Sequence, residues 1–112
     1  MIVIAGEIEV DPADHDRAAA AAGAMIEASR REPGCGAYTI TQELGSPGCF
    51  RIFEEWESQA ALDAHFAAPH LAEFEKRITA LSVRSLGAQR YEIASSKPFV
   101  LPPHLRNAGS GR

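Results

Sequence analysis

The chain has 112 residues, of which 46% are hydrophobic and 23% charged, a composition typical of one ordinary globular domain. The formal net charge of −4 argues against a nucleic-acid-binding module, because such modules carry clustered lysine and arginine, and the 11 basic residues here are scattered. No apolar run approaches the roughly 20 residues that a membrane-spanning helix needs. We therefore expect neither a nucleic acid nor a membrane as a partner.

The N-terminal segment and the two cysteines favour a cytoplasmic location. Residues 1–10 carry carboxylates and lack a basic leader. A hairpin that turns at residues 45–48 would separate Cys49 from Cys35 by about nine residues, roughly 30 Å at the rise of a strand, which is beyond the reach of a disulfide. Two unpaired thiols are typical of a reducing compartment, so we expect a cytoplasmic protein.

The first elements expected along the chain are a strand and a helix. Residues 2–10 are rich in β-branched types and lead into Asp11, which can cap a helix that starts with proline. The helix continues through an alanine-rich segment and ends before Pro33. Its helical spacing predicts one stripe of small or flexible side chains packed on a sheet, formed by Ala18, Ala22, Met25 and Ser29.

A hairpin, two helical segments and a final strand are expected next. Residues 35–44 and 49–57 are strand-like runs on either side of a Gly/Pro/Ser turn. Ser58 can cap a short helix, and a proline at position 69 begins a second helical segment, so a break is expected between them. The last strand is expected from about residue 86 to residue 94.

The resulting order, β-α-β-β-α-β, predicts a ferredoxin-like α+β fold with a four-stranded antiparallel sheet and both helical regions on one face. We assign residues 1–95 to this domain and residues 96–112, rich in proline, glycine and serine, to a C-terminal arm or disordered tail. The second sheet face would be open to water in a monomer, yet the strands do not alternate cleanly between apolar and polar residues. We expect that something covers this face.

Two segments, EPGCGAYTI and FEEWESQAALDAHFAAPHLAEF, resemble the antibiotic biosynthesis monooxygenase family, including its quinol-monooxygenase-like members. The pattern is Pro-Gly-Cys at a strand start, Glu-x-Trp, Ala-Leu-x-x-His, and a Pro-His step that opens the second helical segment. The matching residues are Pro33, Gly34, Cys35, Glu54, Trp56, Ala61, Leu62, His65, Pro69 and His70. With the order of elements, the resemblance covers residues 1–95.

This resemblance implies a dimeric α/β barrel, in which the open sheet faces of two copies pack together. The expected partner is therefore a second copy of the chain, in a homodimer. It also implies a ligand cavity between each sheet and its own helices. A shared fold does not by itself fix a reaction, so the candidate residues have to be considered one at a time.

Glu54 and Trp56 are candidates on the second strand of the hairpin. Glu54 shares strand parity with apolar neighbours, so burial would raise its pKa toward that of a useful base. The alternative is an ion pair or a place in the dimer seam. Trp56 offers a flat apolar wall and one indole donor, which suits an aromatic or quinone-like ring, although a lone tryptophan is also a common core residue.

The candidate histidines lie in the second helical region. His65 is expected on the helix face that meets the sheet, where it could accept a proton or orient a phenolic oxygen. His70, past the proline, could line the same cavity or cap its helix. For each histidine a structural hydrogen bond is an open alternative. We expect no metal site, because a separation of five residues does not stack two side chains on one helix face and no partner ligand is evident.

Two further side chains are predicted to contact substrate. Tyr38 could donate its hydroxyl, with core packing as the alternative, and Phe66 adjoins His65 in the sequence. The fingerprints of nucleotide cofactors are absent, because the sequence has no Gly-rich phosphate loop. We expect no cofactor.

The predicted function is a cofactor-independent monooxygenase that oxidises a quinol or polycyclic phenol, with His65 or Glu54 as the base. In the family, haem degraders and the aromatic-polyketide oxygenases use an asparagine inside the domain beside tryptophan. The single asparagine here is Asn107, in the tail, so the sequence argues against haem degradation and against a direct transfer of the polyketide mechanism. The alternatives are a non-catalytic dimeric barrel that binds a small apolar ligand, and an isomerase or cyclase that uses the same cavity.

Overall fold

The structure is a computed structural model and describes residues 1–108; the end of the predicted tail, residues 109–112, lies outside the described residues. The elements in chain order are β1 (Ile2–Val10), a 3-10 helix (Pro12–Asp14), α1 (His15–Ser29), β2 (Cys35–Gln42), β3 (Cys49–Trp56), α2 (Gln59–Phe66), α3 (Pro69–Thr79), β4 (Val83–Glu92) and α4 (Pro103–Arg106).

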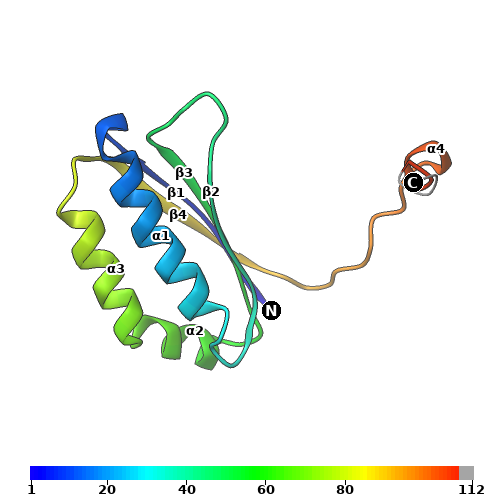
Figure 1. The fold of residues 1–112 in the computed structure, drawn as a ribbon. Helices are drawn as coiled ribbons and strands as arrows, with labels where there is room; N and C mark the ends of the chain where they lie inside the picture. The colour runs from blue at the N-terminus through cyan, green and yellow to red at the C-terminus, as the bar shows by residue number, and fades with distance from the viewer. Residues whose placement is uncertain (109–112) are drawn as a thin grey trace.

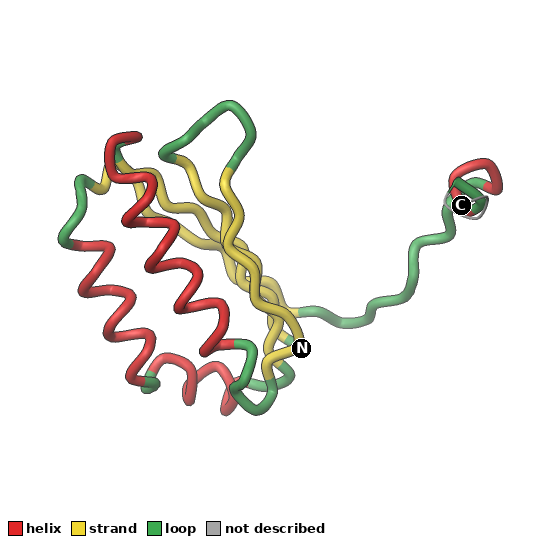
Figure 2. Tube along the Cα trace, viewed as in Figure 1, coloured by secondary structure: helices red, strands yellow, loops and turns green. Residues whose placement is uncertain are grey.

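The four strands form one sheet in the order β2-β3-β1-β4, and every neighbouring pair is antiparallel. The helices α1, α2 and α3 all lie on the same face of this sheet (Figure 1). The tube view shows the same two layers, with the opposite sheet face uncovered (Figure 2). The predicted ferredoxin-like α+β fold is therefore confirmed.

Local sequence signals explain where the helices begin and end. The Asp11 carboxylate accepts a hydrogen bond of 2.9 Å from the Ala13 N–H, as a capping residue does. Ser58 Oγ accepts one of 3.1 Å from the Ala61 N–H at the start of α2. Because proline lacks an N–H, α3 begins anew at Pro69. The predicted stripe of α1 is buried at all four positions, Ala18, Ala22, Met25 and Ser29.

Four strand boundaries differ from the prediction, because β4 starts and ends earlier than expected and β2 and β3 also end earlier. β4 starts at Val83, three residues before the expected start, and pairs there with Val10 of β1. An edge strand is held by backbone hydrogen bonds to one neighbour and needs no buried side chains. The start of β4 therefore lacks an apolar pattern at Val83, Arg84 and Ser85. β2 ends at Gln42 rather than at residue 44, because the next residues enter the turn.

The core has two parts, one at each end of the helical layer. Ile8, Val10 and Phe50 pack with α1 and α3 at one end. At the other end Trp56 and Tyr38 pack with buried residues of β1, α1 and α2. This second cluster surrounds the polar side chains described below.

The register places the two thiols at opposite ends of β3. Cys35 pairs with Trp56, whereas Cys49 pairs with Glu9 of β1, and both cysteines are free. After β4 the chain leaves the domain as an extended segment that carries α4 (Figure 1). Among the helices of residues 1–108, none combines the length and the apolar character that a bilayer crossing requires.

Candidate functional site

Four of the six predicted site residues meet between the sheet and the helices. Trp56 and Glu54 lie on the helix-facing side of β3, and the Trp56 indole N–H donates a 2.9 Å hydrogen bond to Glu54 Oε1. His65 of α2 lies over this pair, with its ring centroid 4.6 Å from that of Trp56. Tyr38 of β2 completes the group at 5.5 Å from the His65 ring. The parity expected for Glu54 and the helix face expected for His65 thus bring the two side chains together.

Glu32 is a member of this site that the sequence reasoning did not identify. His65 Nδ1 donates to Glu32 Oε2 at 2.6 Å, and His70 Nε2 donates to the same oxygen at 3.0 Å. Glu32 stands directly before the Pro-Gly-Cys motif, in the turn between α1 and β2. That position in the motif is the one signal that could have pointed to it, since a loop carboxylate is otherwise read as a surface residue.

The turn between α1 and β2 is held against α2 by close backbone packing. Gly34 has a φ of 85°, and a Cβ at that position would come within 2.6 Å of the Ala61 Cβ. Only glycine accepts this backbone conformation and this contact without strain. The Gly34 carbonyl also accepts a 2.9 Å hydrogen bond from the Glu57 N–H. Both contacts fix the distance between Glu32 and His65.

On the sheet side of the site, the surroundings favour the uncharged forms of Glu54 and Tyr38. Burial raises the pKa of Glu54, and the Glu32 carboxylate raises it further, while the indole hydrogen bond and His65 act in the opposite direction. Burial and then the nearby Glu54 carboxylate raise the pKa of Tyr38, so its hydroxyl remains protonated near neutral pH. His65 Nε2 faces Glu54 Oε1 at 3.7 Å, too far for a hydrogen bond but close enough for a proton to pass after a small shift.

The remaining two predicted residues lie toward the outside. His70 joins the group through Glu32, and its ring centroid is 5.9 Å from that of His65. Phe66 is also 5.9 Å from the His65 ring, but it is 62% exposed and is not drawn into the interior with the others. These two side chains stand between His65 and the solvent.

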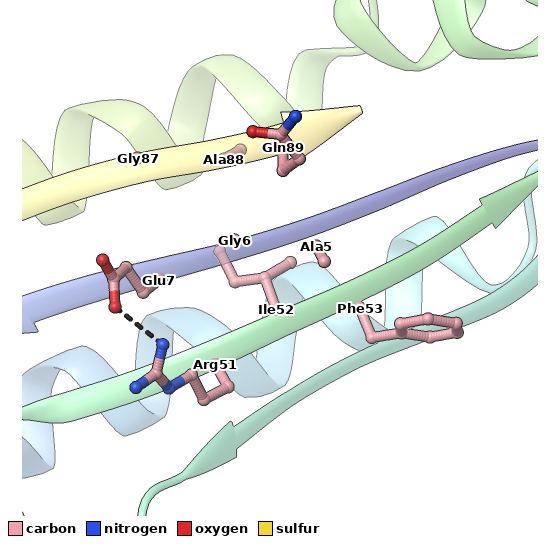
Figure 3. A pocket seen from close by; sticks show the side chains of 9 residues that line it. All are labelled: Ala5, Gly6, Glu7, Arg51, Ile52, Phe53, Gly87, Ala88 and Gln89. Carbon is pink, nitrogen blue, oxygen red and sulfur yellow. Dashed lines mark hydrogen bonds and ion pairs between the residues drawn. The ribbon is translucent and has the colours of Figure 1, made fainter. Parts of the chain in front are cut away.

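The interior position expected for a cavity is filled by packed side chains, since Trp56 and His65 are fully buried. A hollow of about 550 Å³ lies instead on the opposite sheet face (Figure 3). Its floor is made of small residues, and the paired charges of Glu7 and Arg51 stand at one side and Phe53 at the other. The lining residues are Ala5, Gly6, Glu7, Arg51, Ile52, Phe53, Gly87, Ala88 and Gln89.

Several known proteins are similar to this chain over most of its length. The Synechocystis protein sll1783, named as uncharacterised, is 35% identical over 96 residues, which cover 86% of this chain and 65% of that protein. The chain thus spans about two thirds of that relative's length. "Putative monooxygenase YcnE" of Bacillus subtilis is 27% identical over 94 residues, which cover 84% of this chain and 99% of YcnE.

A crystal structure of a "putative antibiotic biosynthesis monooxygenase" from Deinococcus radiodurans superposes with a TM-score of 0.83. It covers 89% of this chain and 99% of that one at 24% identity, and so supports the fold. The family profile described as antibiotic biosynthesis monooxygenase matches residues 1–77, from β1 to the last turns of α3. Because that match takes in more than half of the chain and every residue of the buried site, this protein belongs to the antibiotic biosynthesis monooxygenase family.

Proposed function

We propose that this protein is a cofactor-independent monooxygenase that oxidises a quinol or polycyclic phenol, with His65 as the general base. The observation that carries the proposal is the 2.6 Å hydrogen bond between His65 Nδ1 and Glu32 Oε2. A buried imidazole that is oriented by a carboxylate on one nitrogen presents the other nitrogen as a proton acceptor, and this arrangement serves general bases in many enzymes.

Glu32 acts as a positioning residue in this proposal. By accepting the Nδ1 proton it holds the lone pair on Nε2, which faces the sheet side of the site. After His65 takes a phenolic proton, the negative charge of Glu32 stabilises the imidazolium cation. Glu54, whose pKa is raised by burial, lies next to Nε2 and provides a second place for the proton.

The aromatic side chains supply the contacts for a ring-shaped substrate. Trp56 and Tyr38 flank His65 and offer flat apolar faces with one polar hydrogen each. Since Trp56 and Tyr38 are buried among their neighbours, a substrate would enter from the side of His70 and Phe66 and displace these two side chains. The break between α2 and α3 adjoins these two residues, and such a junction can shift without breaking either helix.

The proposed reaction balances without a cofactor. The deprotonated ring gives electrons to O₂, one oxygen atom is inserted at a ring C–H position, and the other leaves as water. A quinol thereby becomes a hydroxyquinone, and the substrate's own C–H and O–H bonds supply all four electrons that O₂ accepts. The protein contributes the base, the orientation of the ring and the exclusion of bulk water.

The proposal includes a homodimer formed through the open sheet face. This face exposes Phe53 and Tyr91, at 40% and 49%, beside the hollow floored by small residues. In a two-fold interface the same patch lies on both copies, so Phe53 of each chain can fill the hollow of the other. A second copy would thus cover the face that the helices leave open.

The test measures O₂ uptake with a panel of quinols and polycyclic phenols. For His65→Ala we expect turnover to fall at least about 10²-fold, the low end for a lost general base. Glu32→Gln, which keeps a hydrogen-bond acceptor but loses the charge, should lower turnover by a smaller factor, and His104→Ala in the exposed tail is the control.

The unfolding midpoint is measured on the same His65→Ala preparation, because a structural role would lower stability and leave turnover per folded molecule nearly normal. Unchanged turnover would end the assignment of His65 as the base. Product formation under anaerobic conditions would instead indicate an isomerase or cyclase. Ligand binding without turnover would indicate a non-catalytic binding protein.

A further inference from the structure

Three side chains from three separate segments meet at one point of the helical layer. Glu32 comes from the turn after α1, His65 from the end of α2 and His70 from the first turn of α3. His65 Nδ1 and His70 Nε2 lie 2.6 Å and 3.0 Å from the same Glu32 oxygen, and all three potential ligand atoms lie within 4.8 Å of one another.

These separations suit a small dication. Donor atoms at about 2.0–2.1 Å from a tetrahedral zinc ion are about 3.3 Å apart. The two nitrogen–oxygen separations, 2.6 Å and 3.0 Å, need to lengthen by less than about 1 Å, and the separation of the two nitrogens, at most 4.8 Å, needs to shorten by no more than about 1.5 Å. Two imidazoles and one carboxylate are a common donor set for such ions, and they leave one or more positions open.

The helix break explains why this set is not visible from sequence spacing. Along one continuous helix, residues five apart point to different sides, which is why no metal site was expected for His65 and His70. The chain instead turns at Ala67 and Ala68 and restarts at Pro69, so that both rings point to Glu32. The carboxylate that the sequence did not place beside the two histidines is therefore present in the structure.

The surroundings resemble the outer shell of a metal site. A histidine ligand typically has its other ring nitrogen directed to a carboxylate or carbonyl oxygen. Here His65 Nε2 faces Glu54 Oε1 at 3.7 Å, and the Trp56 indole holds that oxygen at 2.9 Å. The Glu32 carboxylate also provides negative charge that a dication would offset.

An ion could reach the site from the solvent. The side chains of Glu32 and His70 are 13% and 24% exposed, whereas that of His65 is 2% exposed. A small hollow of about 50 Å³ between α1 and α3 opens beside His70 and is also lined by Glu73, one turn further along α3. The open coordination position would therefore point toward this side.

We propose that Glu32, His65 and His70 bind one divalent transition-metal ion of the Zn²⁺ or Co²⁺ type. Mixed nitrogen and oxygen donors favour these ions over Mg²⁺ and Ca²⁺, which prefer oxygen ligands. The proposal does not depend on the proposed monooxygenase function. Its consequence for that function is a competition, because the ion would replace the proton shared by His65 Nδ1 and Glu32.

The test uses chelator-treated full-length protein, with no substrate present. Co²⁺ is titrated while its visible absorption and the fluorescence of Trp56, the only tryptophan, are recorded, because Trp56 lies against His65. Zn²⁺ is titrated by calorimetry. We expect one ion per chain with a Kd of about 1 µM or tighter, visible Co²⁺ bands typical of nitrogen and oxygen ligands, and quenching of Trp56.

Variants decide whether these three residues hold the ion. His70→Gln and Glu32→Gln should each weaken binding by at least about 10²-fold, and Glu54→Gln, which alters only the outer shell, by about 10-fold. His104→Gln in the tail should bind as the wild type does. His70 is partly exposed, so its variant keeps the fold even where Glu32→Gln does not, which circular dichroism checks.

A wild-type Kd weaker than about 100 µM would overturn the proposal. Equal affinity in the wild type and in His70→Gln would overturn it as well. Because these titrations contain no substrate, a failure of the monooxygenase assay leaves their result unaffected, and the two proposals fail separately.

Discussion

The two faces of the sheet use the same strands for different purposes. Along β3, Phe50, Glu54 and Trp56 face the helices and are buried, whereas the alternate residues Arg51 and Phe53 face the other way. The inner face is buried, and there Glu54 accepts a hydrogen bond from Trp56 and lies 3.7 Å from His65. The outer face is open and carries its charges as exposed ion pairs.

This difference suits the inner face to chemistry and the outer face to association with a partner. Charges in a dry interior interact strongly and have shifted pKa values, so the inner face is where a base or an ion can be held. Exposed charges interact weakly, but an exposed apolar patch gains free energy when a partner covers it. Changes on the inner face should therefore alter stability and turnover, while changes on the outer face should alter assembly.

The largest effect is expected from Phe53→Glu on the outer face. A carboxylate in the centre of the proposed interface of roughly 2,000 Å² would lose its water without gaining a partner, so the dimer should dissociate at least about 100-fold more readily. Light scattering and sedimentation across a concentration series measure this constant. Leu44→Glu is the matched control, because Leu44 is 97% exposed in the hairpin turn and away from this face. A wild-type protein with the mass of one chain at micromolar concentration would refute the dimer.

Trp56→Phe tests the inner face. The smaller ring leaves space in a closely packed core and removes the donor of the 2.9 Å hydrogen bond to Glu54, so the free energy of unfolding should fall by about 1–3 kcal/mol. Binding of an aromatic ligand should weaken only modestly, because most of the apolar area remains. Chemical denaturation measures the first quantity, with Phe66→Leu at an exposed position as the control. Equal losses in both variants would show that Trp56 has no special place in the site.

The helical pattern and the motifs predicted much of this structure, because they depend on local chemistry. Asp11 and Ser58 cap helices through hydrogen bonds to residues two or three positions away. The parity of Glu54 and Trp56 follows from strand geometry alone. The partnership of Glu32 with His65 could not be predicted in this way. The two residues are 33 positions apart, and their contact depends on how the turn at Gly34 packs on α2.

The same reasoning explains what was missed about the histidines. The spacing rule for a single helix does not describe a segment that contains a break, so the sequence predicts a shared cavity for His65 and His70 but not their common contact with Glu32. The position of Pro69 was recognised as a break, but the angle between α2 and α3 is set by packing on α1 and the sheet, which no local pattern records.

A smaller effect is expected for Asp14, a buried carboxylate at the far end of the helical layer. The Ser82 N–H donates to it at 2.9 Å and Arg17 pairs with it, so its pKa lies below the ordinary 3.8. The stabilisation is therefore present above pH 3.8 and is lost as the pH falls through the lowered pKa. We expect Asp14→Asn to be less stable than the wild type at pH 7 and to differ less from it at pH 3.

Urea unfolding of both proteins at the two pH values measures this difference. Asp16→Asn is the control, because the Asp16 side chain is fully exposed two residues away. A stability difference for Asp14→Asn that stayed constant with pH would show that the charge of Asp14 is not the source of the effect.

The smallest effect is expected from removal of the tail, which leaves the sheet at its outer strand, β4. In the described part of the tail, residues 96–108, every residue is exposed, including the large apolar side chains of Phe99, Val100 and Leu105. A segment that contacts little of its own domain contributes little to its stability. A chain that ends at Ser96 should therefore unfold within about 0.5 kcal/mol of the full-length protein under conditions where both are monomeric. Calorimetry and light scattering on the same samples then distinguish two roles of the tail. A large loss of stability would make residues 97–112 part of the domain. Weaker dimerisation alone would identify them as an arm that binds the second copy.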